Sequence, residues 1–340
     1  MIKICLEYVW IDGNNNLRSK NRIIDFIKNQ DLTLNDIPEW NFDGSSTNQA
    51  ITKDSDIIIK PVRIYNNPFI KFMDSYLILC DCYTNNNIPH KTNTRINCVD
   101  IYEKYKDYEC LFGIEQEYVI FNNDKKPYNW KDKNDPGIGL QGPYYCSIGG
   151  DRNFGREISL EHMKLCLEAN VDICGTNSEV MASQWEFQIG ICDALKISDD
   201  LWIARYILQR LSEKYNCYIT FEPKPYNDNW NCSGGHTNFS TKYMRDKNGL
   251  SNILKACEKL KDKHKEHILL YGENNNLRLS GTHETSNINY FSYDIGNRET
   301  SIRIPINVHN NGYGYLEDRR PASNLDPYIV TSLLIKTICE

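Results

Sequence analysis

Two glutamates lie in an otherwise apolar segment, and the fold must provide a place for their charges. Glu115 and Glu117 lie within residues 111–121, which are otherwise rich in hydrophobic side chains. Because side chains alternate along a strand, both carboxylates would face the same side. At an effective dielectric of about 20 they would repel by a few kcal/mol, so a positive group is expected between them. A divalent metal ion would serve, and an exposed strand with hydrated carboxylates is the alternative interpretation.

Further potential metal ligands occur in other segments. Glu179 and Glu186 belong to a second apolar and aromatic run, 179–188, where a core strand would not place carboxylates. His236 follows two glycines, and Glu317 lies in a charged C-terminal segment. A lone histidine of this kind is usually structural. Several carboxylates with a single imidazole suit Mg²⁺ or Mn²⁺ better than a structural zinc ion.

Five arginines near the C-terminus could hold anionic groups. Arginine contacts carboxylates and phosphates at two points and stabilises a phosphoryl group in transit. Together with metal-binding carboxylates they indicate phosphoryl transfer, whereas a salt-bridged surface is the alternative. The chain has neither a G-x-x-x-x-G-K-[ST] loop nor a kinase catalytic-loop sequence, so any nucleotide site is of another kind. The five are Arg278, Arg298, Arg303, Arg319 and Arg320.

Composition narrows the class of protein. The chain has 39 basic and 45 acidic residues, a net charge of −6 and no basic stripe, which argues against a nucleic-acid partner. Its 13 cysteines form no C-x-x-C pair, a pattern that favours reduced thiols in the cytoplasm. No signal peptide is recognisable, and no run approaches the roughly 20 apolar residues of a membrane span. We expect a soluble, cytoplasmic protein without membrane or nucleic-acid partners.

The 340 residues predict one large domain and one smaller domain. Residues 2–11 end at an Asp12-Gly13 turn signal and predict a hairpin. A polar run at 85–87 predicts the boundary, so the domains are 1–87 and 88–340. The second domain is expected to mix helices and strands. Short strands are expected at 57–59, 76–82 and 111–121, and helices at 101–108, 159–169, 198–215 and 250–263.

Seven segments match one known set of motifs in order along nearly the whole chain. They are 39–47, 112–118, 141–146, 179–190, 236–242, 281–285 and 314–321. This set resembles that of eukaryotic-type glutamine synthetases, which use ATP to join ammonia to L-glutamate through γ-glutamyl phosphate. The resemblance implies an α+β fold. A small N-terminal β-grasp domain would precede a large catalytic domain with a funnel-like curved antiparallel sheet flanked by helices.

The resemblance also implies catalytic and metal-binding roles. Asp43 would help to bind and deprotonate ammonium, Glu284 would close a flap over glutamate, and Arg303 would offset charge on the transferring phosphoryl group. At least two ions, Mg²⁺ or Mn²⁺, are implied for each site. One would be held by Glu115, His236 and Glu317, and the other by Glu117, Glu179 and Glu186.

Two sets of ligand contacts follow from the same resemblance. The implied contacts with ATP, the co-substrate, are Glu115, Glu186, Phe187, Gln188, Ile189, Gly190, Ile191, Asn238, Phe239, Ser240, Arg298, Arg303 and Tyr315. The implied contacts with glutamate are Asn229, Trp230, Asn231, Cys232, His236, Arg278, Arg298 and Arg319. Cys232 replaces the family's usual glycine, and it could still offer its backbone carbonyl unless φ is positive there. Ala182 stands where proline is usual.

The family's assembly and two alternative functions complete the expectations. A homo-oligomer is implied, a decamer of two pentameric rings with each active site between subunits and Asp43 supplied by the neighbour. A γ-glutamyl-amine ligase of the same fold is one alternative, and the retained Asp43 argues against it. A catalytically inactive relative is the other, and the six retained metal positions argue against that.

Overall fold

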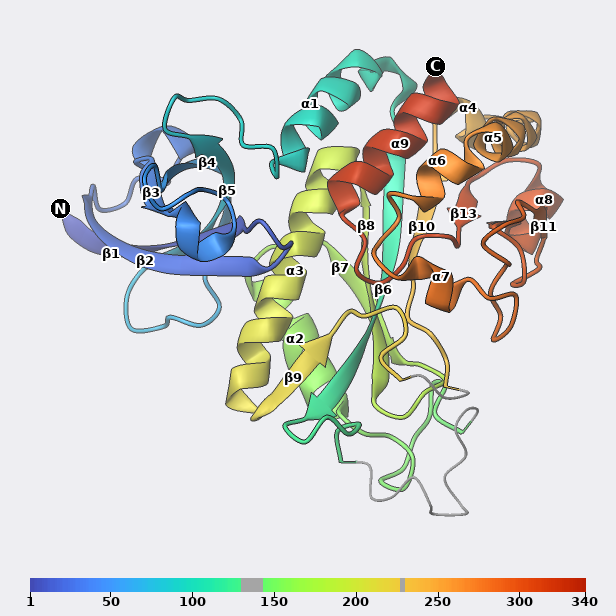
Figure 1. The fold of residues 1–340 in the computed structure, drawn as a ribbon, viewed down its shortest axis with the longest axis horizontal. Helices are drawn as coiled ribbons and strands as arrows, with labels where there is room; N and C mark the ends of the chain where they lie inside the picture. The colour runs from blue at the N-terminus through green and yellow to red at the C-terminus, as the bar shows by residue number, and fades with distance from the viewer. Residues whose placement is uncertain (130–142, 227–229) are drawn as a thin grey trace. The chain divides into compact units, whose positions relative to one another are not determined.

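The computed structural model describes residues 1–129, 143–226 and 230–340. The chain divides into two compact units, Met1–Asn97 with Leu165–Val171, and Cys98–Lys164 with Asp172–Glu340 (Figure 1). The division follows close contacts within each unit. The predicted domain boundary after residue 87 stays a prediction.

The first unit is built on a five-stranded sheet with the order β2-β1-β5-β4-β3. β1 and β2 form the predicted hairpin, and Asp12 fixes its turn by accepting hydrogen bonds from the backbone N–H groups of Asn14 and Asn16. β1 pairs in parallel with β5. Assignment to the β-grasp fold stays a prediction. The elements are β1 (Ile2–Ile11), β2 (Leu17–Phe26), η1 (Leu34–Asp36), β3 (Trp40–Asp43), η2 (Gly44–Thr47), β4 (Asp56–Asn66) and β5 (Ser75–Thr84).

Alternation along β1 supplies part of the core of this unit. Ile4, Leu6, Tyr8 and Trp10 point to one side and are buried in a single hydrophobic cluster. The period of two is the one that a strand imposes on its side chains. The sequence-predicted strands at 57–59 and 76–82 lie within β4 and β5.

The second unit contains a curled, mainly antiparallel sheet with the order β11-β12-β13-β10-β6-β8-β7, and β9 pairs with β6. β6 lies between β10 and β8, and Ile114, Tyr118, Val119 and Ile120 are buried along it. Its glutamates therefore project from a strand that neighbours hold on both sides. The strands are β6 (Leu111–Asn122), β7 (Ile173–Ser178), β8 (Gln184–Cys192), β9 (Cys217–Thr220), β10 (Gly235–Ser240), β11 (Tyr293–Ile295), β12 (Ile302–Ile304) and β13 (Leu316–Asp318).

Helices accompany this sheet. The predicted helices at 159–169, 198–215 and 250–263 correspond to α2, α3 and α5. The predicted helix at 101–108 instead begins at Thr94 and ends at Lys104, and the short 3₁₀ helix η3 follows it at Lys106–Tyr108. The helices are α1 (Thr94–Lys104), η3 (Lys106–Tyr108), α2 (Arg156–Glu168), α3 (Ala194–Lys214), α4 (Lys242–Arg245), α5 (Leu250–Asp262), α6 (His264–Ile268), α7 (Asn275–Arg278), α8 (Ile306–Asn311) and α9 (Pro327–Cys339).

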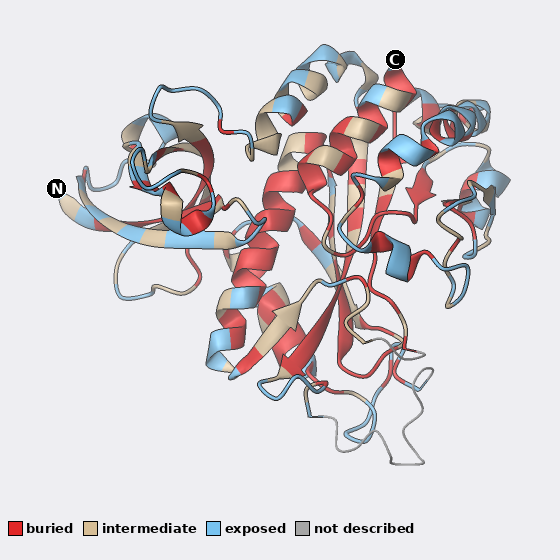
Figure 2. Ribbon diagram, in the orientation of Figure 1, coloured by how far each residue is buried: buried red, intermediate tan, exposed pale blue. Residues whose placement is uncertain are grey.

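Helix α3 supports the strands that carry the glutamates. The carboxylate of Asp193 caps it by accepting hydrogen bonds from the N–H groups of Leu195 and Lys196. The helix contacts β6, β8, β9 and α9. Figure 2 shows that it is buried along most of its length, with exposed residues toward its C-terminal end. A buried helix behind the strands gives the carboxylates a rigid base.

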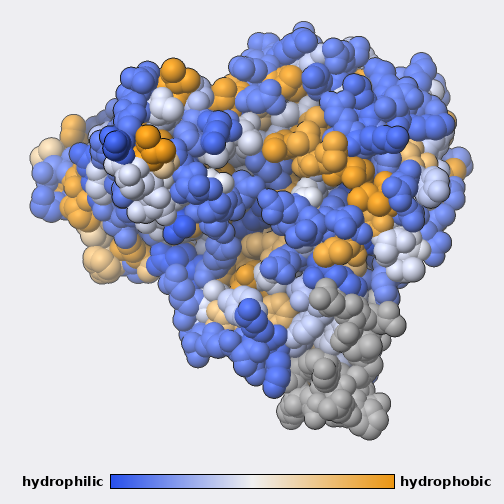
Figure 3. All heavy atoms as spheres, in the orientation of Figure 1, coloured by the Kyte–Doolittle hydropathy of each residue, from blue (hydrophilic) through white to orange (hydrophobic). Residues whose placement is uncertain are grey.

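Hydrophobic surface does not form one continuous band on the face shown in Figure 3, where it occurs in separate patches among hydrophilic residues. Within residues 1–129, 143–226 and 230–340, no helix has both the length and the apolar character needed to cross a membrane.

Candidate active site

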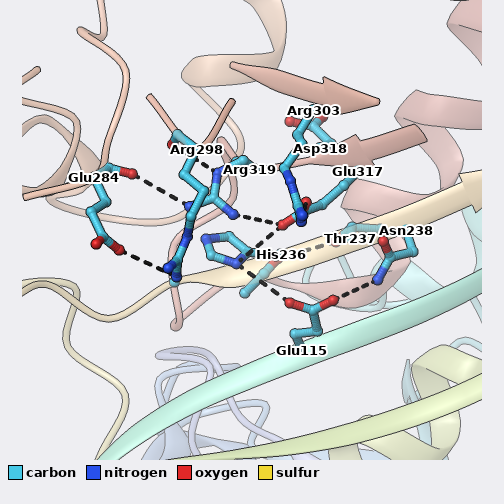
Figure 4. A network of polar contacts seen from close by, with 12 residues as sticks. Glu115, His236, Thr237, Asn238, Glu284, Arg298, Arg303, Glu317, Asp318 and Arg319 are labelled. Carbon is cyan, nitrogen blue, oxygen red and sulfur yellow. Dashed lines mark hydrogen bonds and ion pairs between the residues drawn. The ribbon is translucent and has the colours of Figure 1, made fainter. Parts of the chain in front are cut away.

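Strand register assembles a first cluster from three strands. His236 on β10 lies opposite Glu115 on β6, while Glu317 on β13 lies opposite Asn238. The imidazole Nδ1 of His236 is 3.6 Å from Oε2 of Glu115 and 3.6 Å from Oε1 of Glu317 (Figure 4). One possible ligand atom from each of the three residues lies within 4.8 Å of the other two. The structure thus brings together the first predicted metal set.

A second cluster lies farther along β6. Glu117 pairs in register with Glu186 on β8, and Glu179 follows β7 in the turn between β7 and β8. All three side chains are buried, and their oxygens lie within 4.8 Å of one another. The second predicted metal set is therefore also assembled.

Burial and mutual repulsion disfavour ionisation of the second cluster. Burial, followed by the charge of Glu117, raises the pKa of Glu179 to about 8. Burial and the carboxylates of Glu115, Glu117 and Glu179 raise the pKa of Glu186 to about 9. Burial raises the pKa of Glu117 to about 7, although the N–H of Gly234 and nearby arginines oppose the shift. Oxygen donors that repel one another in a buried pocket fit a divalent cation, which would hold all three ionised.

His236 is held as a neutral base. Burial and the charges of Arg319 and Arg278 keep its pKa well below the usual range. Nη2 of Arg278 lies 3.1 Å from Nε2 of His236, which leaves Nδ1 directed toward the carboxylates of the first cluster. Neutral imidazole is the form that binds a metal ion.

Gly234 lies beside both clusters. Its N–H donates to Oε2 of Glu117 at 2.7 Å. A Cβ at this position would lie 2.5 Å from Nη2 of Arg278 and 3.1 Å from Nε2 of His236. The absence of a side chain therefore lets the guanidinium and the imidazole pack against the turn.

Four of the five predicted arginines converge near the first cluster. Nη1 of Arg303 donates to Oε2 of Glu317 at 2.9 Å, and Nη1 of Arg319 donates to Oε1 of the same carboxylate at 2.7 Å (Figure 4). Buried Arg278 donates to the backbone carbonyl of Arg319. Arg298, half exposed, pairs with Glu284 at 3.2 Å. Arg298 and the partly exposed Arg303 can therefore face an anionic substrate, while Arg278 and Arg319 are buried behind them.

The fifth arginine has a structural partner instead. Arg320 and Asp318 form a fully buried ion pair with an N–O distance of 2.7 Å. Tyr271 donates a hydrogen bond to the same carboxylate, and Arg320 lies over its ring. Burying this pair requires such partners, since an isolated buried charge is costly. The interpretation of Arg320 as a surface or phosphate-binding residue is not supported.

A cavity of about 490 Å³ adjoins the first cluster. Glu115 belongs to both, and Nδ2 of Asn238, another lining residue, donates to its Oε1 at 2.8 Å. Three lining residues escaped the sequence analysis, namely Cys174, Arg245 and Tyr313, since no motif marks them. Of the predicted nucleotide contacts, the cavity is lined by Glu115, Gln188, Ile189, Gly190, Ile191, Asn238, Phe239, Ser240 and Tyr315.

The remaining predicted nucleotide contacts lie elsewhere. Phe187 is fully buried and contacts the rings of Tyr118 and His162. Glu186 belongs to the second cluster, whereas Arg298 and Arg303 approach the first.

The predicted glutamate-binding turn is described from residue 230 onward, and Asn229 lies outside the described residues. Trp230 and Cys232 are buried, and Asn231 is half-buried. The backbone carbonyl of Cys232 accepts a hydrogen bond from Nε2 of Gln184 at 3.0 Å. Cys232 is not among the described residues with positive φ, so its backbone does not need glycine.

Glu284 lies in a strained turn. His283 and Glu284 have φ of 55° and 61°, a conformation that side chains other than glycine rarely adopt. Thr285 ties the turn to the backbone carbonyl of Arg278 at 3.0 Å, and Nη2 of Arg319 donates to the carbonyl of Glu284. The turn is thus joined to the arginines at its base, while its acidic tip is half exposed.

Asp43 belongs to the first unit, so its predicted meeting with the clusters stays a prediction. Its carboxylate accepts hydrogen bonds from the N–H and Oγ of Ser45 and from Oγ of Ser46. These bonds, led by the one from the Ser45 hydroxyl, lower the pKa of Asp43. The exposed side chain is therefore a fixed anion.

Comparison with known proteins identifies similar chains. The family described as the glutamine synthetase catalytic domain matches residues 97–339. Glutamine synthetases of Debaryomyces hansenii and Saccharomyces cerevisiae are 47% and 48% identical over 337 residues, covering 99% of this chain and 90% of each relative. A protein of Acanthamoeba polyphaga mimivirus is 49% identical over 340 residues, which is 98% of this chain and 94% of that protein.

A solved structure also matches. The cryo-EM structure of Plasmodium falciparum glutamine synthetase superposes with a TM-score of 0.76 at 20% identity, covering 98% of this chain and 71% of that one. Similarity at this identity concerns the fold. It confirms the predicted mixed α+β architecture with a curled antiparallel sheet and helices.

Proposed function

Because this chain belongs to the glutamine synthetase family, we propose that it is a glutamate–ammonia ligase that forms L-glutamine with cleavage of ATP to ADP and phosphate. One observation carries the proposal: two clusters of potential metal ligands, each with one glutamate from β6, lie beside converging arginines and a cavity. Carboxylates for metal and arginines for phosphate are the parts that phosphoryl transfer needs.

The donor sets fit two divalent ions, Mg²⁺ or Mn²⁺, one in each cluster. Glu115, His236 and Glu317 would hold the first, and the second would be held by Glu117, Glu179 and Glu186. Bound there, the ions would neutralise phosphate charge during transfer. The arginines would also offset phosphate charge, and Arg303 and Arg319 are held in position by their hydrogen bonds to Glu317.

The cavity is the proposed seat of the nucleotide base and sugar. Its walls from β6 and β8 and from Tyr313 and Tyr315 offer apolar and aromatic surface for a flat ring. Glu115 of the first cluster lines this cavity beside Asn238, so a nucleotide seated here would direct its phosphates toward the first cluster.

Glutamate is proposed to bind between the arginines and the 230–232 turn. Arg298 and Arg319 would grip its carboxylates, whereas buried Arg278 holds Arg319 in place through the Arg319 carbonyl. The γ-carboxylate then attacks the terminal phosphate to give γ-glutamyl phosphate. Glu284 covers this intermediate and excludes water, which would otherwise hydrolyse it.

Ammonium is proposed to lose its proton with help from Asp43 of a neighbouring subunit and then to attack the acyl phosphate. This role requires a ring assembly, and we propose the decamer of two pentameric rings that the family resemblance implies. The fixed negative charge of Asp43 supports binding of a cation. The reducing cytoplasm is the proposed compartment, which fits 13 scattered cysteines that form no C-x-x-C pair.

A phosphate-release assay tests the proposed reaction. Purified protein would receive glutamate, ATP and Mg²⁺ or Mn²⁺, with ammonia in one arm and methylamine in the other. The proposal predicts strong release with ammonia and glutamine as the product. Equal or higher rates with methylamine would indicate a γ-glutamyl-amine ligase, and no release in either arm would indicate an inactive relative.

A further inference from the structure

Two thiols that the proposed chemistry does not use meet in the interior of the second unit. Cys110 directly precedes β6, and Cys339 is the last residue of α9. Both are buried, and their sulfur atoms are 3.8 Å apart. They are separated by 229 positions in the sequence, so only the fold brings them together.

The local backbone leaves room for a covalent bond. A disulfide has a sulfur–sulfur distance of about 2.0 Å, so the two atoms need to approach by a further distance of roughly 1.8 Å. Cys339 is the last residue of α9, and helix ends are less constrained than helix interiors. Cys110 lies between η3 and β6, next to Glu109, and belongs to neither element. Both positions can shift without breaking a regular hydrogen-bond ladder.

A cation is fixed beside the pair. Nζ of Lys259, on α5, donates to the backbone carbonyl of Ile338 at 2.8 Å. The hydrogen bond with Cys110 and burial raise the pKa of Cys339, and the positive charge of Lys259 partly opposes this shift. A thiolate formed at Cys339 would therefore have a compensating charge nearby.

We propose that Cys110 and Cys339 are a redox modification site at which a disulfide ties helix α9 to the start of strand β6. The oxidant is hydrogen peroxide, which is small and uncharged enough to reach buried sulfur. One thiol, after losing its proton, attacks a peroxide oxygen, the O–O bond breaks, and a sulfenic acid and water form. The second thiol attacks the sulfenic sulfur and expels a second water. Two thiols lose two electrons, and the peroxide gains them.

The disulfide would fix the start of strand β6, which carries two proposed metal ligands. β6 carries Glu115 and Glu117, and the carbonyl of Glu109, one residue before Cys110, accepts a hydrogen bond from the cavity residue Arg245 at 2.8 Å. Closing a loop of more than two hundred residues also restricts the unfolded chain strongly. Oxidation should therefore make the second unit harder to unfold.

Peptide mapping of the full chain tests the proposal. Reduced protein would be treated with hydrogen peroxide, alkylated, digested and analysed by mass spectrometry. The expected product is a peptide pair linked through Cys110 and Cys339 that dithiothreitol releases, together with a rise in Tm of at least about 3 °C. Thiols that remain alkylatable, or that are recovered as sulfinic acids or in other disulfides, would overturn the proposal.

Matched variants locate the effect. In Cys339→Ser the peroxide-induced rise in Tm should vanish, and Cys110→Ser should behave in the same way. Cys98→Ser is the control, because Cys98 is also buried and faces α9 but meets the hydroxyl of Thr331 at 3.5 Å rather than a thiol. A rise in Tm that persists in Cys339→Ser would assign the stabilisation to other cysteines. The wild-type map stands even if a serine variant folds poorly.

Discussion

The backbone N–H of Gly234 donates a 2.7 Å hydrogen bond to Oε2 of Glu117. The same residue leaves the space that the Arg278 guanidinium fills, 2.5 Å from where a Cβ would be. The turn at Gly234 thus orients Glu117 of the second cluster. It also leaves room for Arg278, which contacts His236 of the first cluster. The two clusters should respond together when this turn is disturbed.

Gly234→Ala should weaken both proposed metal sites. The added methyl group would push Arg278 and His236 away, and a misplaced ligand or supporting group typically costs 10- to 100-fold in metal affinity. Titration of activity with Mn²⁺ measures this loss. Gly150→Ala is the control, because a Cβ at Gly150 meets nothing within 4 Å. Wild-type metal dependence in Gly234→Ala would show that the turn can relax.

Glu117→Gln should abolish metal-dependent activity and leave a folded protein. The substitution keeps the shape of the side chain and removes one of three carboxylates from the second cluster. Without metal, the variant should unfold at an equal or higher temperature than wild type, because a repelling buried charge is gone. Activity assays with Mn²⁺ check the first expectation, and thermal unfolding with and without Mn²⁺ checks the second. Full activity would remove Glu117 from the proposed ligands.

Metal-free protein should become less stable as pH rises from about 5 to about 9. The raised pKa values of Glu117, Glu179 and Glu186, about 7, 8 and 9, mean that the folded state binds protons which the unfolded state has released. Stability is therefore greatest below the unfolded pKa near 4.5 and is lost as pH rises through the folded values. Unfolding by urea at several pH values measures the slope.

Two comparisons test the origin of that slope. Saturating Mn²⁺ should flatten it, because the bound cation keeps the carboxylates ionised in the folded state. Glu186→Gln should reduce it even without metal. A slope that is the same in all three conditions would have to come from other groups.

Glu284→Ala should lower the rate of glutamine formation by on the order of 10²–10⁴, as expected when a positioned acid or base is removed. Phosphate release without ammonia should rise relative to synthesis, since the turn no longer shields the acyl phosphate. Parallel assays of glutamine and phosphate give the ratio. Glu299→Ala, at another exposed acidic position, should change neither rate. If both rates fell equally in Glu284→Ala, shielding would be the wrong account.

Subunit mixing tests the shared active site. Asp43→Ala and Arg319→Ala proteins should each be nearly inactive. When they are co-expressed and assemble at random, head-to-tail contacts should place an intact Asp43 opposite an intact Arg319 in about a quarter of sites. Activity should return to that fraction of wild type. Mixed rings, verified by mass, that stay inactive would mean that Asp43 acts within its own chain.

The sequence marked Glu115, Glu117, Glu179 and Glu186 as candidate metal ligands because strand periodicity and the misfit of charge in apolar segments are local signals. Their grouping into two sets came from the family resemblance. Glu115 and Glu117 share a face of β6 for the reason their spacing indicated. The need for glycine at position 234 was not predictable, since it depends on an arginine 44 positions later in the chain. Arg245 reaches the cavity through a tertiary contact that no motif encodes. Asp43 was predicted from the family resemblance alone, because no local sequence pattern shows which active site its carboxylate would serve.

Strand β13 tolerates no error of alignment. Glu317 faces the cluster with His236, while the next residue, Asp318, pairs with Arg320 in the interior. A slip of one position would drive Glu317 into the space shaped for Asp318 and turn the internal ion pair toward substrate. The Asp318–Arg320 pair would be broken, and a buried charge without its partner costs several kcal/mol. The buried Asp318–Arg320 pair therefore fixes the alignment of β13, and with it the position of Glu317 beside His236.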